Sequence, residues 1–438
     1  MATGSSNPLN WSFELAFLHV NLVWSCIRPM PKISKILLLV ASVALVLTVF
    51  LGVNASGVSA ATEEQDGAYK QINVYSEVLR HIQTDYVVEP NIPAVTNGAL
   101  RGLLESLDAN SSYLTPEEYK AYKSDKGGKA QVGINVSKRY GYATVVSVVP
   151  GSPADKANLN DGDIIEAIGT QDTRELSLAM IQMMLSGQPG SELSVSVVRP
   201  RKSQPEKVSM TRLVPSVPPV AETMYENSSI LYLKPGVLDH DHAQQIEAKL
   251  KQMSKAGNKK ILLDLRDVAA GDMTEATRVA NFFLNSGTIA SLEGQKVQKV
   301  TFTAEASKSI NTTAPIVVIT NRGTAGPAEL VAAALLDNKR AELVGEKTFG
   351  EGAQQKTFDL PDGGALILSV AKYKSPSGKK LQDEGVTPGL LVASNTDDGS
   401  AAEEENADTP VAAPVAKPGV AVDEQLSKAL ELLKSKSA

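Results

Sequence analysis

The chain has 438 residues, too many for one compact core, so several domains are expected. Hydrophobic residues make up 42% of the sequence and charged residues 21%, which are ordinary values for a folded protein and exclude a fibrous or wholly disordered one. The formal net charge of -6 and the absence of a long Lys/Arg run exclude an extended phosphate-binding surface, so we expect no nucleic-acid partner.

Near the amino end, an uncharged apolar run at residues 36–53 follows Lys32 and Lys35 and precedes small residues at 55–60. This pattern is typical of a secretory signal peptide, and its length also suits a membrane anchor, so both alternatives stay open. The positive flank places the rest of the chain outside the cytoplasm, in the periplasm or cell envelope. Contact with a membrane is therefore expected if the segment is not cleaved.

The start of the chain has a second feature, because Met30 begins an ordinary signal-peptide sequence. We expect residues 30–60 to be the signal or anchor and residues 1–29 to be a mis-assigned start or a cytoplasmic tail. The one cysteine, Cys26, precedes the apolar run, so a form cleaved after that run would contain no disulfide.

Helical periodicity follows in residues 68–122, where Val74, Val78 and Ile82 recur at helical spacing and further apolar residues recur up to Leu107. This predicts a small helical region over residues 61–128. It ends in the sequence GLLESLDANSSYLTPEEY, at residues 102–119.

Short β-rich runs come next, at residues 132–136, 143–149 and 192–199, with a helix expected at 176–185. The order of strand, turn, helix and strand resembles a circularly permuted PDZ domain of bacterial proteases. A PDZ domain takes a peptide as an added strand and holds its terminal carboxylate on backbone amides. The resemblance places these amides in one loop, formed by Gln131, Val132, Gly133 and Ile134. In the alternative interpretation, these residues only turn the chain and fill a β-domain core.

A histidine-rich stretch, Asp239-His240-Asp241-His242, is the one candidate metal-ligand cluster. It stands between Lys234-Pro235-Gly236 and a predicted helix at 243–253, so it is interpreted as a loop that enters a helix with Asp241 as the N-cap. Two histidines at this spacing do not share a helix face, and no metal site is expected.

From residue 214 onward, apolar β-runs alternate with helical periods, with strands at 230–233, 260–265, 316–320 and 342–345. Helices are expected between them. Nearly continuous apolar strands in α/β order predict a sheet covered by helices on both faces. The fold class is therefore α/β for this core, with an α+β PDZ module before it.

These motifs together resemble the carboxyl-terminal processing protease (tail-specific protease) family of serine peptidases. The resemblance rests on the residues 102–119, the PDZ-like module, and landmarks in the core such as LDLR at 263–266, GEKTFG at 345–350 and GVTP at 385–388. It implies a core of the ClpP/crotonase-like type. The expected segments after the helical region are a PDZ domain at 129–213, a protease-like core at 214–395, a disordered linker at 396–422 and an amphipathic helix at 423–438.

Family members cut peptides with a serine nucleophile and a lysine base, and both positions are altered here. The resemblance places the nucleophile at Gly326, in the run TAGPAE, and the base at Glu351, in TFGEG. Glycine has no attacking atom, and a glutamate has no hydroxyl at the paired position to activate. Gln355 matches the glutamine that orients the lysine in the family.

A third departure affects the oxyanion turn, because the family's Asn-Pro-Gly-Gly is replaced by VAAG at residues 268–271. Ala270 cannot adopt a positive φ as cheaply as glycine, so amides at Ala270 and Gly271 are expected to be misaimed. A rebuilt site would need a substitute pair, and the candidates are Thr324, Lys347, Ser369 and Lys372. Each is more simply explained as a loop or strand residue.

The tail from 394 to 422 is rich in Asp, Glu, Ala and Pro and lacks aromatic residues, which is typical of a flexible tether. We expect the helix after it to dock on a neighbour or on its own core. The leading hypothesis is a proteolytically inactive, cofactor-free protein that binds protein C-termini or unfolded tails and modulates an active protease relative. An active serine-type endopeptidase with rearranged groups and a structural envelope protein are the alternatives.

Overall fold

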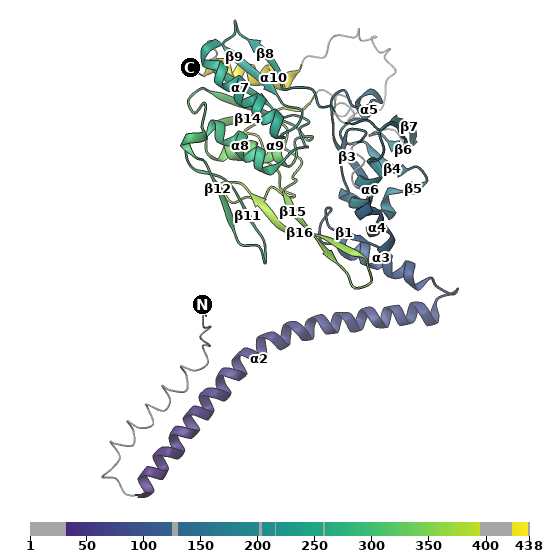
Figure 1. Cartoon of the computed structure of the whole chain (residues 1–438), viewed down its shortest axis with the longest axis vertical. Coiled ribbons are helices and arrows are strands. Elements are labelled where there is room, and N and C mark those ends of the chain that lie inside the picture. The colour runs from purple at the N-terminus through teal and green to yellow at the C-terminus, as the bar shows by residue number, and fades with distance from the viewer. Residues whose placement is uncertain are drawn as a thin grey trace, which may run out of the picture. The chain divides into compact units, whose positions relative to one another are not determined.

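The computed structural model describes residues 32–124, 130–200, 204–214, 216–256, 259–394 and 423–436 (Figure 1). The chain divides into two compact units, Met1–Val95 and Thr96–Ala438. Two of the expected segments, residues 1–29 and 396–422, lie outside the described residues.

The first unit is dominated by one long helix, α2 (Lys32–Asp85), which includes the predicted signal or anchor segment. The side chains of residues 47–68 in this helix lie outside the described ones. Among the residues whose structure is described, no helix combines the length and the apolar character needed to cross a membrane.

The predicted helical region continues as two shorter helices, α3 (Ile92–Glu105) and α4 (Pro116–Ser124), joined through the short strand β1 (Ser112–Leu114). Within the second unit, Leu104 is buried, whereas Leu103 and Leu107 are exposed. Periodicity alone therefore identified the helix but not which side chains it buries.

A PDZ-type domain follows, with a six-stranded sheet in the order β2-β3-β4-β6-β7 and β5 paired with β4. Its strands are β2 (Ile134–Ser137), β3 (Ala143–Val148), β4 (Ile164–Ile168), β5 (Gln171–Asp172), β6 (Glu192–Val198) and β7 (Glu206–Thr211). Its helices are α5 (Pro153–Lys156), α6 (Leu178–Leu185) and the 3-10 turns η2 (Arg139–Gly141) and η3 (Thr173–Glu175). Alternate residues of the strands pack with Ile181 of α6 in one core. The strand β2 is the first in the sheet order and therefore lies at its edge.

The protease-like core contains a sheet in the order β17-β14-β13-β10-β9-β8, in which β8 is antiparallel and the other pairs are parallel. The strands are β8 (Ala221–Tyr225), β9 (Ile230–Lys234), β10 (Lys260–Asp264), β13 (Ile316–Thr320), β14 (Ala341–Gly345) and β17 (Leu390–Leu391). The helices are α7 (His240–Ala256), α8 (Met273–Phe283), α9 (Pro327–Asp337) and α10 (Glu424–Ser435).

The parallel sheet is covered on both faces, as the apolar strands predicted. Leu263 and Val318 pack in the cluster that contains α7, α8 and α9, while Leu262 and Val317 pack with Ala429 and Leu433 of α10. This alternation follows from the two-residue period of a strand. The carboxyl-terminal helix thus docks on its own core, one of the two sites expected for it.

A second sheet, in the order β1-β16-β11-β12 with β15 beside β16, was not predicted. Its strands in the core are β11 (Thr288–Glu293), β12 (Val300–Thr303), β15 (Ala353–Asp359) and β16 (Ala365–Lys374), and η4 (Ala306–Lys308) follows β12. Most side chains of β15 are exposed, so the apolar runs that marked the other strands are absent there.

The histidine-rich stretch begins α7, but Asp239 caps the helix rather than Asp241. The Asp239 carboxylate accepts a hydrogen bond from the backbone N–H of His242 at 2.9 Å and also lies 2.7 Å from Nδ1 of that ring. Nε2 of His242 lies 3.0 Å from the carbonyl oxygen of Pro218. Asp241 therefore lies inside the first turn, and the prediction of its cap role was wrong because the helix starts earlier.

Candidate functional site: a PDZ groove beside an altered protease centre

Gly326 lies between β13 and α9, at the amino end of the helix, with Pro327 as the first helical residue. Its backbone has φ 53° and ψ -113°, a conformation that favours glycine. A Cβ atom at this position would have Ala269 O, at 3.7 Å, as its nearest contact. A strained strand-to-helix turn is a device that presents a nucleophilic serine in other hydrolases. This chain has such a turn, without a side chain on it.

Glu329, one turn further along α9, is fully buried and holds the surrounding loops together. Its Oε2 accepts hydrogen bonds from the N–H groups of Gly326 at 2.9 Å and Glu351 at 2.7 Å. Its Oε1 accepts from the N–H of Gly350 at 2.7 Å and from the hydroxyl of Thr348. Oε2 of Glu329 therefore bonds to the backbone of both Gly326 and Glu351, the residues that the resemblance assigns to the nucleophile and base positions.

Burial raises the pKa of Glu329 to about 7, against the opposing effect of the four donors around it. The role of this residue was missed in the sequence, although a signal was present. A single glutamate at the third position of the apolar helical run PAELVAAALL is a buried polar group that needs partners.

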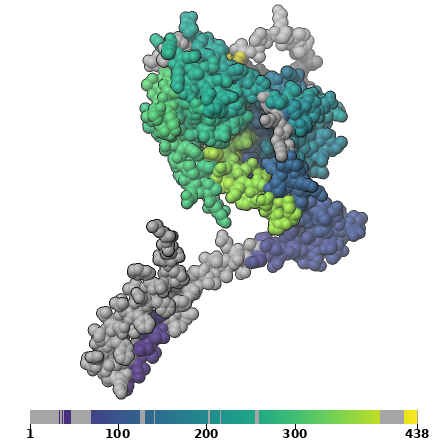
Figure 2. All heavy atoms as spheres, viewed as in Figure 1, coloured from purple at the N-terminus to yellow at the C-terminus, as the bar shows by residue number. Residues whose placement is uncertain are grey.

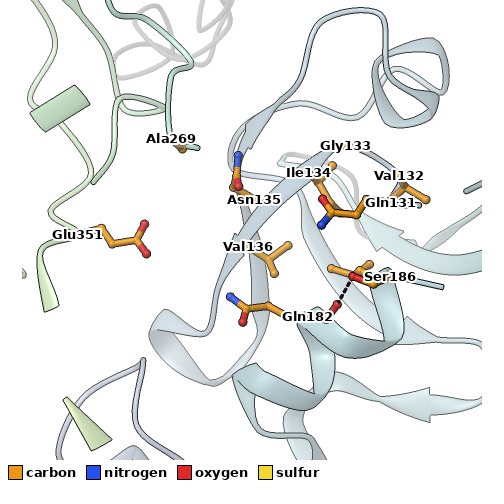
Figure 3. Close-up of a pocket in the computed structure, with 11 residues that line it drawn as sticks. Gln131, Val132, Gly133, Ile134, Asn135, Val136, Gln182, Ser186, Ala269 and Glu351 are labelled. Carbon is orange, nitrogen blue, oxygen red and sulfur yellow. Dashed lines mark hydrogen bonds between the residues drawn. The ribbon is translucent and has the colours of Figure 1, made fainter. Parts of the chain in front are cut away.

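Glu351 follows β14 in the loop that leads to β15, and its side chain extends toward the PDZ domain (Figure 3). Within the part of the chain that the structure describes, its carboxylate has no hydrogen-bond donor, whereas its backbone N–H is bound by Glu329. Burial raises the pKa of Glu351, and the nearby Arg139 guanidinium acts in the opposite direction. The group is thus an unpaired carboxylate in a cleft.

Arg139 of the PDZ domain contacts the same loop of the core. Its Nη1 donates to the carbonyl oxygen of Phe349 at 2.7 Å and its Nη2 to that of Gly350 at 2.5 Å, while the guanidinium lies 4.2 Å from the centre of the Phe349 ring. This residue was not identified from the sequence, because an arginine in a turn carries no local signal of a partner 210 residues away.

The predicted peptide-binding residues Gln131 to Ile134 line a cavity of about 280 Å³. The other lining residues are Asn135, Val136, Gln182, Leu185, Ser186, Ala269 and Glu351. The groove between β2 and α6 therefore opens directly onto the altered base position, and Figure 3 shows Glu351 facing β2 across it.

The loop before β2 is shaped for close approach of a backbone. Gly133 has φ 83°, and a Cβ atom there would lie 2.2 Å from Cβ of Ser152. Among the described residues, the N–H groups of Val132 and Gly133 have no acceptor, although both residues are buried. Buried amides without partners are costly, so an acceptor from outside the chain would be stabilised here.

The turn at residues 268–271 was expected to lack a positive φ at Ala270. Ala270 does not take a positive φ, which falls instead at Asp267 (64°) and Gly271 (141°). A Cβ atom on Gly271 would lie 2.4 Å from the carbonyl oxygen of Leu238, so this glycine is required by a close contact. Ala270 thus keeps an ordinary φ, and the misaiming of the amides of Ala270 and Gly271 stays a prediction.

The remaining predicted residue, Gln355, lies exposed on β15. Its side-chain amide donates to the carbonyl of Asn110, and the structure does not bring it to Glu351.

Three of the candidates for a rebuilt site, Thr324, Ser369 and Lys372, contact other groups of the chain. The Thr324 hydroxyl is buried, donates to the carbonyl of Leu265 at 2.8 Å and accepts from the N–H of Asn321 at 3.0 Å. The Ser369 hydroxyl donates to Asp108 at 3.2 Å, and Nζ of Lys372 lies 3.5 Å from Asp383. Among the described residues, no group of three or more His, Cys, Asp or Glu side chains is placed to hold a metal ion.

The elbow at Gly326, the doubly covered α/β core and the PDZ groove beside it define a PDZ-containing protein with a peptidase-type core. Residues 229–392 match Peptidase family S41, and residues 130–210 match the PDZ domain. The carboxy-terminal-processing protease of Bartonella bacilliformis is 30% identical over 76% of this chain and 78% of its own length. The corresponding protease of Synechocystis sp. is 30% identical over 78% and 84%.

The chain therefore belongs to the carboxyl-terminal processing protease family, as the motifs suggested. Among solved structures, the photosystem II D1 C-terminal processing protease superposes with a TM-score of 0.61 at 24% identity, covering 73% of this chain and 92% of that one. This similarity confirms the mixed α/β fold.

Proposed function

We propose that this chain is a non-catalytic member of its family that binds the carboxyl-terminal tails of other proteins in the PDZ groove. The observation that carries the proposal is the elbow at Gly326, which has the backbone of a nucleophile position and no side-chain oxygen. Glu351 adds to it, because a carboxylate at the base position has no hydroxyl at Gly326 from which to take a proton.

The engaged state of Thr324 supports the same conclusion. Its hydroxyl proton is donated to a buried carbonyl and its oxygen accepts from an amide, so an attack on a substrate would break both bonds. A nucleophile must also stand within about 3.5 Å of the scissile carbonyl in an aligned geometry, which a fully buried side chain does not reach.

Tail binding is supported by the N–H groups of Val132 and Gly133, which lack an acceptor among the described residues, and by the edge position of β2. A terminal carboxylate accepts hydrogen bonds from such a loop, while the tail adds a strand to β2. The partners that suit this chemistry are unfolded protein C-termini. Holding such tails would let the chain modulate an active relative that cleaves them.

We also propose that the chain acts outside the cytoplasm, in the periplasm or cell envelope. The support is the charge-free run at residues 36–53 behind two lysines. Mass spectrometry of protein from the membrane and soluble envelope fractions would distinguish a cleaved signal from a retained anchor. Recovery of the chain in the cytoplasm with an intact amino end would contradict the proposal.

The decisive experiment incubates the full chain with an unfolded protein tail and follows cleavage by mass spectrometry. We expect cleavage no faster than in buffer and no labelling by a fluorophosphonate probe that captures active serines. Turnover by the unaltered chain would instead establish an active peptidase with rearranged groups. Absence of both turnover and peptide binding would favour a structural envelope protein.

A further inference from the structure

The cavity between the PDZ domain and the core is lined on the PDZ side by residues 131–136 and by the end of α6. On the core side its lining includes one carboxylate, that of Glu351. We propose that Glu351 makes this groove selective for protein tails that carry a lysine or arginine two to four residues before the terminal carboxylate. The inference rests on the proposed tail binding and adds the chemistry of the preferred tail. It also gives the altered base position a function of its own.

The position of the basic side chain follows from strand geometry. The terminal carboxylate lies at the loop of Val132 and Gly133, and the tail runs antiparallel along β2 at about 3.3 Å per residue. Residues before the terminus therefore pass Ile134 and then Val136, beside Gln182 of α6. Glu351 faces this part of the groove (Figure 3). Because Val136 stands three residues after Gly133, the tail residue beside it is two to four residues before the terminus.

Glu351 lacks a donor because nearby donors are already engaged. Arg139 directs two of its N–H groups at the carbonyls of Phe349 and Gly350, and it stacks over the Phe349 ring. The Asn135 amide donates to the hydroxyl of Ser147 at 2.8 Å. A cationic side chain from a bound tail would supply the hydrogen bonds that the described residues do not.

The surroundings make this contact stronger than an exposed ion pair. Glu351 is half-buried, and Val136 and Leu185 line the same cavity, so its charge is screened less than that of a fully exposed carboxylate. The volume, about 280 Å³, is near the lower limit of ordinary ligand pockets and suits a few residues of an extended chain. A charge-assisted hydrogen bond in such a site changes affinity by roughly 10- to 100-fold.

The test measures binding of fluorescent ten-residue peptides to the full chain by polarisation. Each peptide has the same apolar carboxyl end and a single Lys, Gln or Glu at one of the positions one to five residues before it. We expect the Lys peptide to bind at least roughly 10-fold more tightly than the Gln peptide at the facing positions, and the Glu peptide to bind most weakly. An amidated carboxyl end should abolish binding.

Variants assign the preference to one side chain. Glu351→Gln should equalise the Lys and Gln peptides, and Glu351→Lys should favour the Glu peptide. The matched control is Glu384→Gln, an exposed residue of a nearby loop that does not line the cavity; it should leave the preference intact. Glu351→Gln changes no backbone contact, so it serves if the lysine variant fails to fold.

Two failures are distinguishable. Equal binding of Lys and Gln peptides, or a lysine preference that survives in Glu351→Gln, would overturn the role of Glu351 while tail binding stands. If no peptide binds saturably, the proposed function fails and the inference falls with it.

Discussion

The two sides of the cleft differ in what they carry. On the core side, Gly326 and Glu351, which the resemblance assigns to the nucleophile and the base, are joined through Glu329 and carry neither a hydroxyl nor an amine. On the PDZ side, the groove has its edge strand, its glycine turn and two amides without an acceptor among the described residues. The loops on the core side are therefore held by the buried carboxylate of Glu329, whereas the groove offers donors to a partner from outside the chain. The proposed function implies that binding and cleaving are separable in this fold.

The largest expected effect comes from removing the carboxylate of Glu329, which holds the loops on the core side of the cleft. We expect Glu329→Gln to lower the free energy of unfolding by about 2 to 4 kcal/mol, because its NH₂ would face two buried donors in either orientation. Urea unfolding followed by circular dichroism measures this. Glu384→Gln should change the free energy by less than about 0.5 kcal/mol. Equal stability of the two variants would mean that the loops are held by other contacts.

Titration of Glu329 gives a second effect on stability. Its pKa is about 7 in the folded chain against 4.5 ordinarily, so between these values the folded state binds more protons than the unfolded state. Stability should therefore fall as pH rises from 4.5 to 7, by up to about 3 kcal/mol from this group. The measurement is the difference between the unfolding free energies of the unaltered chain and Glu329→Gln at several pH values. A difference that does not vary with pH would contradict burial as the dominant influence.

Restoring the chemistry sharpens the comparison from the other direction. The double variant Gly326→Ser, Glu351→Lys should cleave an unfolded tail roughly 100-fold faster than the unaltered chain, because the backbone that positions both groups is present. A side chain fits at Gly326, although its φ costs roughly 1 to 3 kcal/mol. Each single variant is the control and should remain at background. Failure of the folded double variant would place the remaining defect in the turn at Ala270 and Gly271.

Much of the fold could be predicted because local pattern and burial agree. The strands near Leu263 and Val318 are apolar on both faces, so their sequence alone indicated a covered sheet. In the second sheet, β12 and β15 were missed because they expose most side chains, and β15 pairs with β16 through backbone groups. The cap of α7 was misplaced because Asp239 and Asp241 are chemically identical candidates, and only the helix start separates them.

The parts of the candidate site that lie in sequence motifs could be predicted. The parts that depend on contacts between residues far apart in the chain could not. The groove loop and the two altered positions followed from motifs, and the structure brings Glu351 to that loop's cavity. Arg139 and the role of Glu329 depend on contacts across the chain that no local spacing encodes. The expected link between Gln355 and the base position is absent because that side chain points to Asn110 instead.

The smallest expected effect is a pH dependence of peptide preference in the PDZ groove, which would arise from Glu351 of the core. Burial raises the pKa of Glu351, so its carboxylate becomes neutral at a higher pH than an exposed glutamate, although the charge of Arg139 reduces this shift. Nearby, Lys372 and Arg139 each lie 3.5 Å from Asp383, so these charges offset one another. We expect the preference for Lys over Gln peptides to fall several-fold as the pH is lowered from about 8 to about 4.5, the ordinary pKa of glutamate, because protonation removes the attracting charge.

The same titration with Glu351→Gln should give a flat ratio, because both peptides then meet a neutral amide. Using the ratio of two peptides cancels pH effects on the terminal carboxylate and on the PDZ fold, which both peptides share. A ratio that stays constant in the unaltered chain, or that varies equally in Glu351→Gln, would show that the tail does not reach the core. The PDZ groove would then bind on its own, and the altered base position would have no part in recognition.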